Sequence, residues 1–397
     1  MAGRTGDHLT ETEQAGRILS RICSTEKKEN GKMHYTLHLT DRCNLACRYC
    51  YVKKGSTDMT AAVARRVVDL ASDGEHHGIV FFGGEPLLCR DVIYETVAYG
   101  EEKQKHGEGF FHYKITTNGM LLDEAFLEYA CEHDIFIALS HDGLAQDVCR
   151  VDSDGHGTAE TLEKTVRMLL ERKPYAPVMM TVTPRTLPMY ADSVKYLYDL
   201  GFRYLICSMD YSADWQDSHL PMLKRQYRSL ASFYREKSRK EEKFYLSPFE
   251  TKMASHIRQH DLRAERCELG KKQLSIAPDG RIYPCVQLIE EAYCIGDVEK
   301  GIDEAKRRQL YLMNEREKEE CTDCAIRDRC SHHCACVNKC ATGSITSLSP
   351  FQCAHERILL PIADSLAERL WQEKNALFLQ KQYNDMFPLL SLTEDRG

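Results

Sequence analysis

The feature that most constrains the fold of this chain is an alternation of β-rich and helix-periodic segments from Tyr35 to about Asp210. The β-rich runs predict strands at Tyr35–Thr40, Gly78–Phe82, Phe111–Thr117, Ile135–Ser140, Val178–Thr183 and Tyr204–Ser208. Helical periodicity separates them, at Met59–Ser72, Asp91–Lys105, Asp123–His133, Ala159–Arg172 and Met189–Leu200. Strands that alternate with such helices indicate βα units and a parallel sheet. Because a closed barrel needs eight units, six predict an α/β fold with a partial (β/α)6 barrel.

Length, hydropathy and charge limit the class of protein. The 397 residues favour two or three domains, and the 43% of hydrophobic residues suffices for a sizeable core. No apolar run approaches the roughly 20 residues that span a bilayer. The N-terminus lacks the basic-then-apolar pattern of a signal peptide. We therefore expect a cytoplasmic protein without membrane contact, and the net charge of −7 argues against nucleic acid as its main partner.

Three cysteines follow the first predicted strand as a C-x3-C-x2-C run: Cys43, Cys47 and Cys50. Clustered cysteines in a reducing compartment indicate a metal site rather than disulfides. A cubane iron–sulfur cluster takes four thiolates, so three would leave one iron open to a small molecule. Zinc sites that use cysteine alone normally take four. The run therefore predicts a cluster with one open iron.

This spacing, with Tyr49 before the third cysteine, resembles the radical S-adenosylmethionine (SAM) superfamily. The resemblance covers residues 35–210 and implies the same partial barrel. It also implies that the open iron chelates SAM, and that one electron cleaves SAM to methionine and a 5′-deoxyadenosyl radical. Cys43, Cys47 and Cys50 would then be the catalytic cluster ligands.

Further motifs follow the next predicted strands, where barrels of this kind place function. Gly83-Gly84-Glu85-Pro86 matches the family's GGEP motif, which binds the SAM amino group, and its glycines allow close backbone approach to a ligand. By resemblance, later strand ends contact the ribose and adenine, and an arginine pairs with the carboxylate. The predicted cofactor-binding residues are Tyr49, Gly83, Gly84, Glu85, Asn118, Ser140, Asp142 and Arg150. Asn118 and Asp142 precede glycines, so plain turns are the alternative there.

A second set of cysteines occupies the C-terminal part of the chain. Asp279-Gly280 between two short β-rich runs predicts a hairpin that ends near Cys285. The whole pattern resembles the SPASM domain of radical SAM enzymes, over residues 267–354, and consists of Cys267, Cys285, Cys321, Cys324, Cys330, Cys334 and Cys353. A zinc ribbon is disfavoured, because zinc would not explain the partners at 267, 285 and 353.

The SPASM resemblance implies two auxiliary [4Fe–4S] clusters, hence three clusters in all. The outer one would be held by Cys321, Cys324, Cys330 and Cys353, and the inner one by Cys267, Cys285 and Cys334. Some relatives complete the inner cluster with a cysteine between the first two, which this chain lacks. An open inner iron, able to take a substrate thiolate, is therefore expected. Cys294 is an alternative fourth ligand, while Cys336 and Cys340 fit no position and are either small hydrophobes or spare ligands.

The remaining segments are predicted to be helical. A short helix is expected at Glu11–Ile22, a charged helix with a solvated face between Ala213 and Lys243, and an amphipathic helix at Glu356–Gln382 that packs against the protein or docks a partner. The expected domains are an N-terminal extension at 1–33, the partial barrel at 34–212, a helical linker at 213–262, the SPASM domain at 263–354, and a C-terminal helix and tail at 355–397.

The choice of reaction depends on two departures from a related group. SPASM relatives divide mainly into anaerobic sulfatase maturases, which make formylglycine, and maturases of ribosomally made peptides. The first group carries an aspartate after the second SPASM cysteine, where this chain has Val286, and glutamine before GGEP, where it has Phe82. Both departures favour a peptide maturase that joins a cysteine sulfur to carbon as a thioether. Formylglycine formation, C–C crosslinking and epimerisation are the alternatives.

Partners follow from the same resemblance. A Cys-containing precursor peptide would be the substrate, and a flavodoxin or ferredoxin the electron donor. A separate protein that recognises the leader peptide is a further candidate. A non-catalytic electron carrier is disfavoured, because a carrier needs neither the open iron nor GGEP. A radical enzyme acting on nucleic acid is disfavoured by the acidic charge and the SPASM cysteines.

Overall fold

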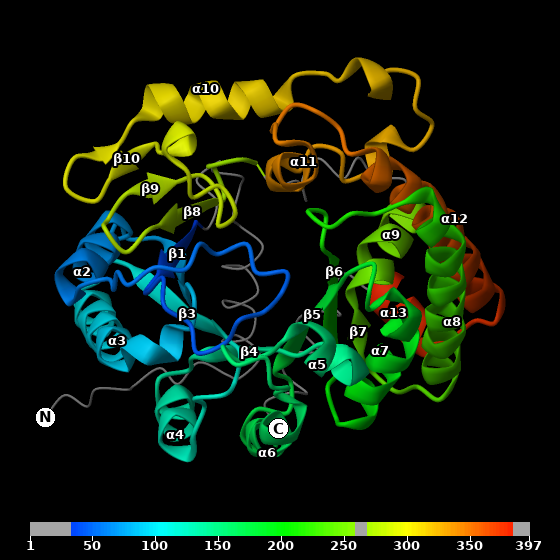
Figure 1. The fold of residues 1–397 in the computed structure, drawn as a ribbon, viewed down its shortest axis with the longest axis horizontal. Helices are drawn as coiled ribbons and strands as arrows, with labels where there is room; N and C mark the ends of the chain where they lie inside the picture. Colours follow the sequence, from blue (N-terminus) through cyan, green and yellow to red (C-terminus); the bar gives the residue numbers. More distant parts are fainter. Residues whose placement is uncertain (1–32, 259–267, 384–397) are drawn as a thin grey trace, which may run out of the picture. The chain divides into compact units, whose positions relative to one another are not determined.

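A curved nine-stranded sheet organises the computed structural model, which describes residues 33–258 and 268–383 (Figure 1). The strand order is β7-β6-β5-β4-β3-β2-β1-β8-β9. Neighbouring strands pair in parallel except for β8 and β9, which are antiparallel. The strands are β1 (His34–His38), β2 (His76–Phe82), β3 (Phe110–Thr117), β4 (Phe136–Ser140), β5 (Pro177–Val182), β6 (Tyr204–Met209), β7 (Tyr245–Leu246), β8 (Gln273–Ile276) and β9 (Ile282–Tyr283). A separate hairpin joins β10 (Gly296–Asp297) to β11 (Gly301–Ile302).

Helices cover the outer, convex side of the sheet (Figure 1). In the barrel part they are α2 (Ala61–Leu70), α3 (Arg90–Lys105), α4 (Glu124–Glu132), α5 (Gln146–Cys149), α6 (Ala159–Arg172), α7 (Tyr190–Asp199), α8 (Leu220–Arg239) and α9 (Ser247–Arg258). Side-chain caps fix two of the starts: Thr60 accepts from the Val63 amide and Asp123 from the Phe126 amide. None of the helices in the described ranges combines the length and the apolar composition that crossing a membrane requires.

The expected α/β architecture is confirmed. Each of the six predicted strands and five predicted helices is present, and no end moves by more than two residues. Apolar side chains of the strands are fully buried, as at Leu37, Phe81 and Ile115, so the sheet contributes to the core. The first six strands place their C-terminal ends at one edge, where the predicted cysteine and glycine motifs follow β1 and β2.

The sheet is extended at its edges by β7, which was not predicted, and by the strands of the predicted hairpin, β8 and β9. β7 pairs with β6, and β8 pairs with β1. The chain that follows residue 268 therefore joins the barrel sheet directly. The predicted hairpin is confirmed by the pairing of Ser275 with Tyr283, and Gly280 in its turn has a φ of +86°. Cys285 follows two residues after β9, as the hairpin prediction requires.

The charged helix expected between 213 and 243 also has a buried face. α8 packs against α7 and α12 through Leu223, Tyr227, Leu230 and Phe233, so it is a layer of the fold. The helices that follow are α10 (Glu304–Glu315), α11 (Ala335–Thr342), α12 (Pro350–Gln372) and α13 (Ala376–Tyr383).

The predicted C-terminal helix is two helices. α12 begins earlier, where Ser349 caps it, and Lys374, with a φ of +50°, separates it from α13. α12 packs against α8 and α9, with Leu359, Leu366 and Leu370 buried, while Ile358 and Ile362 are half-buried. The helix expected at Glu11–Ile22 lies outside the described residues.

Candidate functional site

One cavity of about 590 Å³ connects the two cysteine regions. Its barrel side includes Cys43, Cys47 and Cys50, and its opposite side includes residues of the 330s from the C-terminal part of the chain. The lining combines strand ends with α9, α11 and α12. Residues predicted from sequence to bind SAM therefore face the same space as Cys334, a predicted ligand of the inner auxiliary cluster.

The loop that carries Cys43, Cys47 and Cys50 is fixed by backbone hydrogen bonds. The amide of Ala46 donates to the Val151 carbonyl at 2.7 Å, and the amide of Arg48 donates to the Cys149 carbonyl at 2.9 Å. Burial raises the pKa of the Cys47 thiol to about 11 and that of Cys43 above its ordinary value. Thiolates are the form that binds metal, so loading this loop would release protons.

The glycine motif packs against the chain just before this loop. The amide of Gly84 donates to the Thr40 carbonyl and the amide of Glu85 to the Arg42 carbonyl, at 2.8 and 2.9 Å. A Cβ on Gly84 would lie 2.0 Å from the Arg42 carbonyl oxygen, and one on Gly83, whose φ is +136°, would lie 2.6 Å from that of Thr40. Side chains are therefore excluded there by the cysteine segment itself, a reason for the glycines that the sequence does not reveal.

Glu85 is fully buried and does not line the cavity. Its carboxylate accepts from the Thr117 hydroxyl at 2.7 Å, from the Asn118 amide at 2.9 Å and from the Leu87 amide at 3.1 Å. Burial raises its pKa despite these donors. In this arrangement Glu85 connects the ends of β2 and β3, and its oxygens are occupied by the protein rather than turned to the cavity.

Asp142 is also fully buried and instead positions two cavity residues. It accepts from the Tyr49 hydroxyl at 2.6 Å and from the Thr181 amide at 3.0 Å, and it pairs with Arg150 Nε at 3.1 Å. The Arg150 guanidinium lies 5.3 Å from the centre of the Tyr49 ring. Tyr49 and Arg150 both line the cavity, whereas Asp142 does not, so Asp142 fixes the two side chains from the side away from the cavity.

Asn118 connects the third strand end to the cysteine loop. Its side-chain nitrogen Nδ2 lies 2.8 Å from Asn44 Oδ1 and 3.8 Å from the Cys43 sulfur. Of the predicted SAM contacts, those that line the cavity are Tyr49, Gly83, Gly84, Asn118, Ser140 and Arg150. The thiols, the donors and the close backbone approach suit a cluster with a charged small-molecule ligand.

Four cysteines predicted for the outer cluster are near one another. The pKa of Cys321 is raised by burial and by the charges of Cys353 and Cys324, and that of Cys330 is raised to about 12 by burial, Glu356 and Cys353. Arg357 donates to the Cys324 sulfur at 3.7 Å. A set of four thiols beside one guanidinium suits a fully ligated, negatively charged cluster.

The inner set is less regular. Cys267 lies outside the described residues, while Cys285 is buried at the end of the hairpin. A hydrogen bond with Cys336 lowers the pKa of Cys285. The Cys336 sulfur lies 3.4 Å from the Cys334 sulfur. This contact lowers the pKa of Cys334 to about 7. Cys340 donates to Gln287 at 3.5 Å. Cys294 donates to the Gly296 carbonyl at 3.4 Å and is not part of the cavity lining.

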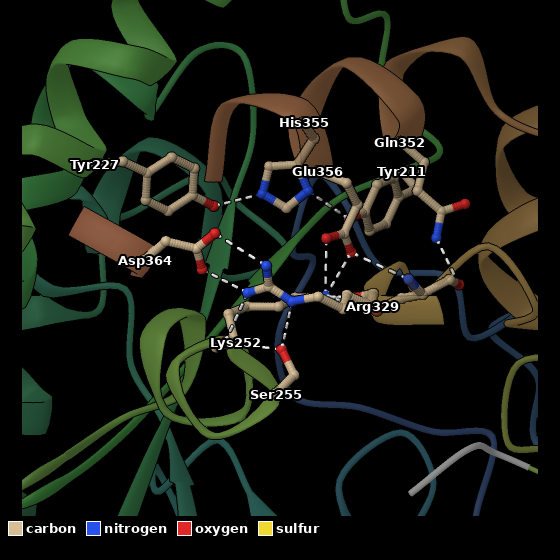
Figure 2. Close-up of polar contacts among 10 residues, drawn as sticks. Tyr211, Tyr227, Lys252, Ser255, Arg329, Gln352, His355, Glu356 and Asp364 are labelled. Atoms are coloured by element: carbon tan, nitrogen blue, oxygen red, sulfur yellow. Dashed lines mark hydrogen bonds and ion pairs between the residues drawn. The ribbon is translucent and has the colours of Figure 1, made fainter. Parts of the chain in front are cut away.

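A buried polar network fixes residues 329–331 against α9 and α12 (Figure 2). Lys252 of α9 pairs with Glu356 of α12 at 2.8 Å, and both side chains are less than 10% exposed. Lys252 also donates to the Arg329 carbonyl and to Ser331, and Glu356 accepts from the Ser331 amide. The Arg329 guanidinium in turn pairs with Asp364. This network holds residues 329–331, which include Cys330 of the outer set and end three residues before Cys334 of the inner set.

His355 connects this network to the barrel (Figure 2). Its ring nitrogens lie 3.0 Å from the Tyr211 hydroxyl and 2.6 Å from the Tyr227 hydroxyl. Burial lowers its pKa to about 4, so the imidazole is neutral at pH 7 and donates to one tyrosine while accepting from the other.

Sequence reasoning missed several cavity residues. Met179 and Thr181 lie on β5 and Tyr211 follows β6, so their positions at strand ends were an available signal. His355 and Glu356 were predicted only as part of a packing helix. No spacing rule connects them to Lys252, because that contact spans more than 100 residues.

Two family models match this chain. The radical SAM superfamily matches residues 37–206, and the iron–sulfur cluster-binding SPASM domain matches residues 267–325. An uncharacterised protein, MJ0907 of Methanocaldococcus jannaschii, is 31% identical over 198 residues, which are 49% of this chain and 68% of that protein.

Two named relatives are more distant but cover more of this chain. The cysteine-type anaerobic sulfatase-maturating enzyme of Clostridium perfringens is 22% identical over 74% of this chain and 85% of its own length. The antilisterial bacteriocin subtilosin biosynthesis protein AlbA of Bacillus subtilis is 23% identical over 72% of this chain and 62% of its own length.

Solved structures share the fold. The enzyme anSMEcpe with bound AdoMet and Cp18Cys peptide superposes with a TM-score of 0.73 at 18% identity, over 87% of this chain and all of that one. Streptococcus suis SuiB bound to precursor peptide SuiA gives 0.60 at 15% identity, over 89% and 83%. The matched domains and relatives establish that the chain is an enzyme of the radical SAM superfamily with a C-terminal SPASM domain.

Proposed function

We propose that this enzyme is a peptide maturase that joins a cysteine sulfur to carbon, as a thioether, in a ribosomally made precursor peptide. The observation that carries the proposal is the cavity lined by Cys43, Cys47 and Cys50 on one side and, on the other, by Cys334 of the SPASM pattern with its neighbours Cys336 and Cys340. A peptide side chain in that space would be within reach of both. AlbA and SuiB, which are named for bacteriocin biosynthesis and for a bound precursor peptide, support a peptide substrate.

The chain's own residues would bind and orient the cofactor. In the proposal, Cys43, Cys47 and Cys50 hold the SAM-binding cluster, and Arg150 and Tyr49, fixed by Asp142, present donors to bound SAM. Asn118 and Ser140 would contact the remainder of SAM from the ends of β3 and β4. When bound, this cofactor supplies a carbon radical that removes one hydrogen from the peptide. A reduced flavodoxin or ferredoxin would supply the electron that starts each turnover.

The SPASM residues would complete the enzyme with two auxiliary clusters. The outer set is Cys321, Cys324, Cys330 and Cys353, and the inner set includes Cys267, Cys285 and Cys334. A thioether forms with loss of two hydrogens from the peptide, one to the adenosyl carbon and one as a proton, which leaves one electron for the protein to accept. A nearby redox cluster is suited to accept it.

Formylglycine formation is the second candidate, and it is favoured by likeness to the sulfatase maturases. Two features weigh against it. Val286, directly after Cys285, offers no carboxylate where that group carries a base. The carboxylates that do line the cavity are engaged: Glu356 pairs with Lys252, and Asp210 accepts from the Ser212 amide and hydroxyl.

Mass spectrometry of a short Cys-containing peptide, coexpressed from a reading frame beside that of the enzyme, tests the proposal. A thioether predicts the loss of two hydrogens and one cysteine that iodoacetamide no longer alkylates. Cys47→Ala is the matched control and should leave the peptide unchanged. An aldehyde at Ser or Cys would support the sulfatase-maturase alternative, and an unchanged mass with inverted stereochemistry would indicate an epimerase. Modification that occurs only when a third protein is coexpressed would indicate a separate leader-recognition protein.

A further inference from the structure

Cys285 and Cys334 are the two described cysteines of the predicted inner set. A third thiol, Cys336, lies beside them and lines the cavity, although the seven-cysteine SPASM pattern does not include it. Cys336 lies 3.4 Å, sulfur to sulfur, from Cys334 and hydrogen-bonds Cys285 as well. A sulfur–sulfur distance of 3.4 Å is far longer than a disulfide of about 2 Å, so these are separate thiols. Cys285, Cys334 and Cys336 thus form one contiguous group, although Cys285 is about fifty residues away in sequence.

The helix that carries Cys336 is held in a fixed orientation. α11 begins directly after Cys334, which is its N-cap. The fully buried Asn338 donates to the His332 carbonyl at 3.0 Å, which connects the helix to the loop before it. Cys336 therefore lies in the first turn of α11, two residues after the N-cap, and its position relative to Cys334 is set by the helix.

The other candidates for a fourth inner ligand have different partners. Cys340, one turn further along α11, donates to Gln287. Cys294 donates to a backbone carbonyl two residues away and lies outside the cavity lining. No residue between Cys267 and Cys285 is a cysteine, so the sequence offers no ligand there. Among the described cysteines outside the pattern, Cys336 is the one in contact with two pattern cysteines.

We propose that Cys336 is a further thiolate ligand of the inner auxiliary cluster in the peptide-free enzyme, beside Cys285 and Cys334. The seven-cysteine pattern counts three inner thiolates, so Cys336 would make four, which complete a cubane and leave no open iron in this state. This differs from the open inner iron expected from the sequence pattern. The inference rests on the SPASM clusters of the proposed function, but it doesn't depend on which peptide product the enzyme makes.

The test uses the full chain, purified anaerobically, with the SAM-binding cluster removed by the substitutions Cys43→Ala, Cys47→Ala and Cys50→Ala. This background should contain about 8 irons in two four-iron clusters. Adding Cys336→Ala should, on mild oxidation, release about one iron per chain and produce the EPR signal of a three-iron cluster. The matched control, Cys340→Ala on the same helix, should leave the iron content and the spectrum unchanged.

Three results would overturn the proposal: equal spectra for Cys336→Ala and the background, a three-iron signal with Cys340→Ala alone, or the same signal in both variants. Alkylation of the unsubstituted enzyme gives a second readout if the variant fails to fold. Cys336 should resist iodoacetamide while the clusters are present and react once they are stripped and the thiols reduced. Alkylation of Cys336 in the cluster-loaded enzyme would refute its role as a ligand. Neither readout uses peptide turnover, so failure here is distinct from failure of the proposed function.

Discussion

The ion pair of Lys252 and Glu356 should be essential to the cluster-bearing half of the molecule, and Glu356→Gln tests this. The substitution keeps the size and the hydrogen-bonding shape of the side chain but removes its charge. Lys252, 8% exposed, would keep its bonds to the Arg329 carbonyl and Ser331 but lose its counter-charge. Removing one partner of a buried ion pair costs about 3–5 kcal/mol.

The assay is the rate at which iron–sulfur absorbance is lost from the anaerobic enzyme in a fixed concentration of urea. A change of 3 kcal/mol corresponds to roughly 150-fold if it acts entirely on the unfolding rate, so we expect acceleration of at least about tenfold. Tryptophan fluorescence should change in parallel. Trp215 stacks on Phe351 of α12 at 4.3 Å and reports whether that helix stays in place.

The matched control is Glu95→Gln, which breaks a pair with Arg65 in which both side chains are about half exposed. Exposed pairs contribute about 0–1 kcal/mol, so this variant should release its clusters at nearly the wild-type rate. Replacing both buried partners, as Lys252→Met with Glu356→Leu, should recover much of the loss because no uncompensated charge remains. Equal rates of cluster loss for Glu356→Gln and Glu95→Gln would refute the claim that the pair of Lys252 and Glu356 stabilises the cluster-bearing half of the molecule.

Three further predictions concern the cofactor, the core and the metal content. Asp142→Asn should raise the Kd for SAM by about 10-fold or more, since hydrogen bonds to charged groups contribute about 1.5–3 kcal/mol; equilibrium dialysis giving a value within twofold of wild type would contradict this. Burial lowers the pKa of His38 to about 4, so its neutral form is stabilising and stability is lost as pH falls from 6.5 towards 4. Urea unfolding should show this loss as about 2 kcal/mol between pH 7 and pH 5, and His38→Gln should abolish that part of the pH dependence. Iron analysis should give about 12 irons per chain, whereas a value near four would eliminate the auxiliary clusters.

Local patterns predicted the barrel well because each of its units satisfies its own periodicity. The strands from β1 to β6 are five to eight residues long; β3 alternates buried with more exposed positions and β1 and β4 are mostly buried runs, and both patterns can be detected in sequence. β7 has two residues and β8 has four, too few for a period, and both join the sheet through contacts remote in sequence.

The site was predictable in its residue types and less so in their orientation. The motif identified Glu85, but its inward position depends on Thr117 and Asn118, more than thirty residues later. The role of Asp142 behind Tyr49 depends on a contact across 93 residues. Cys336 is two residues from Cys334 in sequence, yet its significance comes from Cys285 on another element. Such partners are set by tertiary packing, which no spacing rule encodes.

The most direct test of the central claim is deuterium transfer from a precursor peptide that is deuterated at all its carbon positions. If one cavity brings SAM and the peptide together, deuterium should appear in 5′-deoxyadenosine in a one-to-one ratio with each thioether formed. The modified peptide should lose one carbon-bound deuterium and the hydrogen of one cysteine thiol. Thioether formation without labelled 5′-deoxyadenosine, or labelled 5′-deoxyadenosine with an unmodified cysteine, would contradict the account.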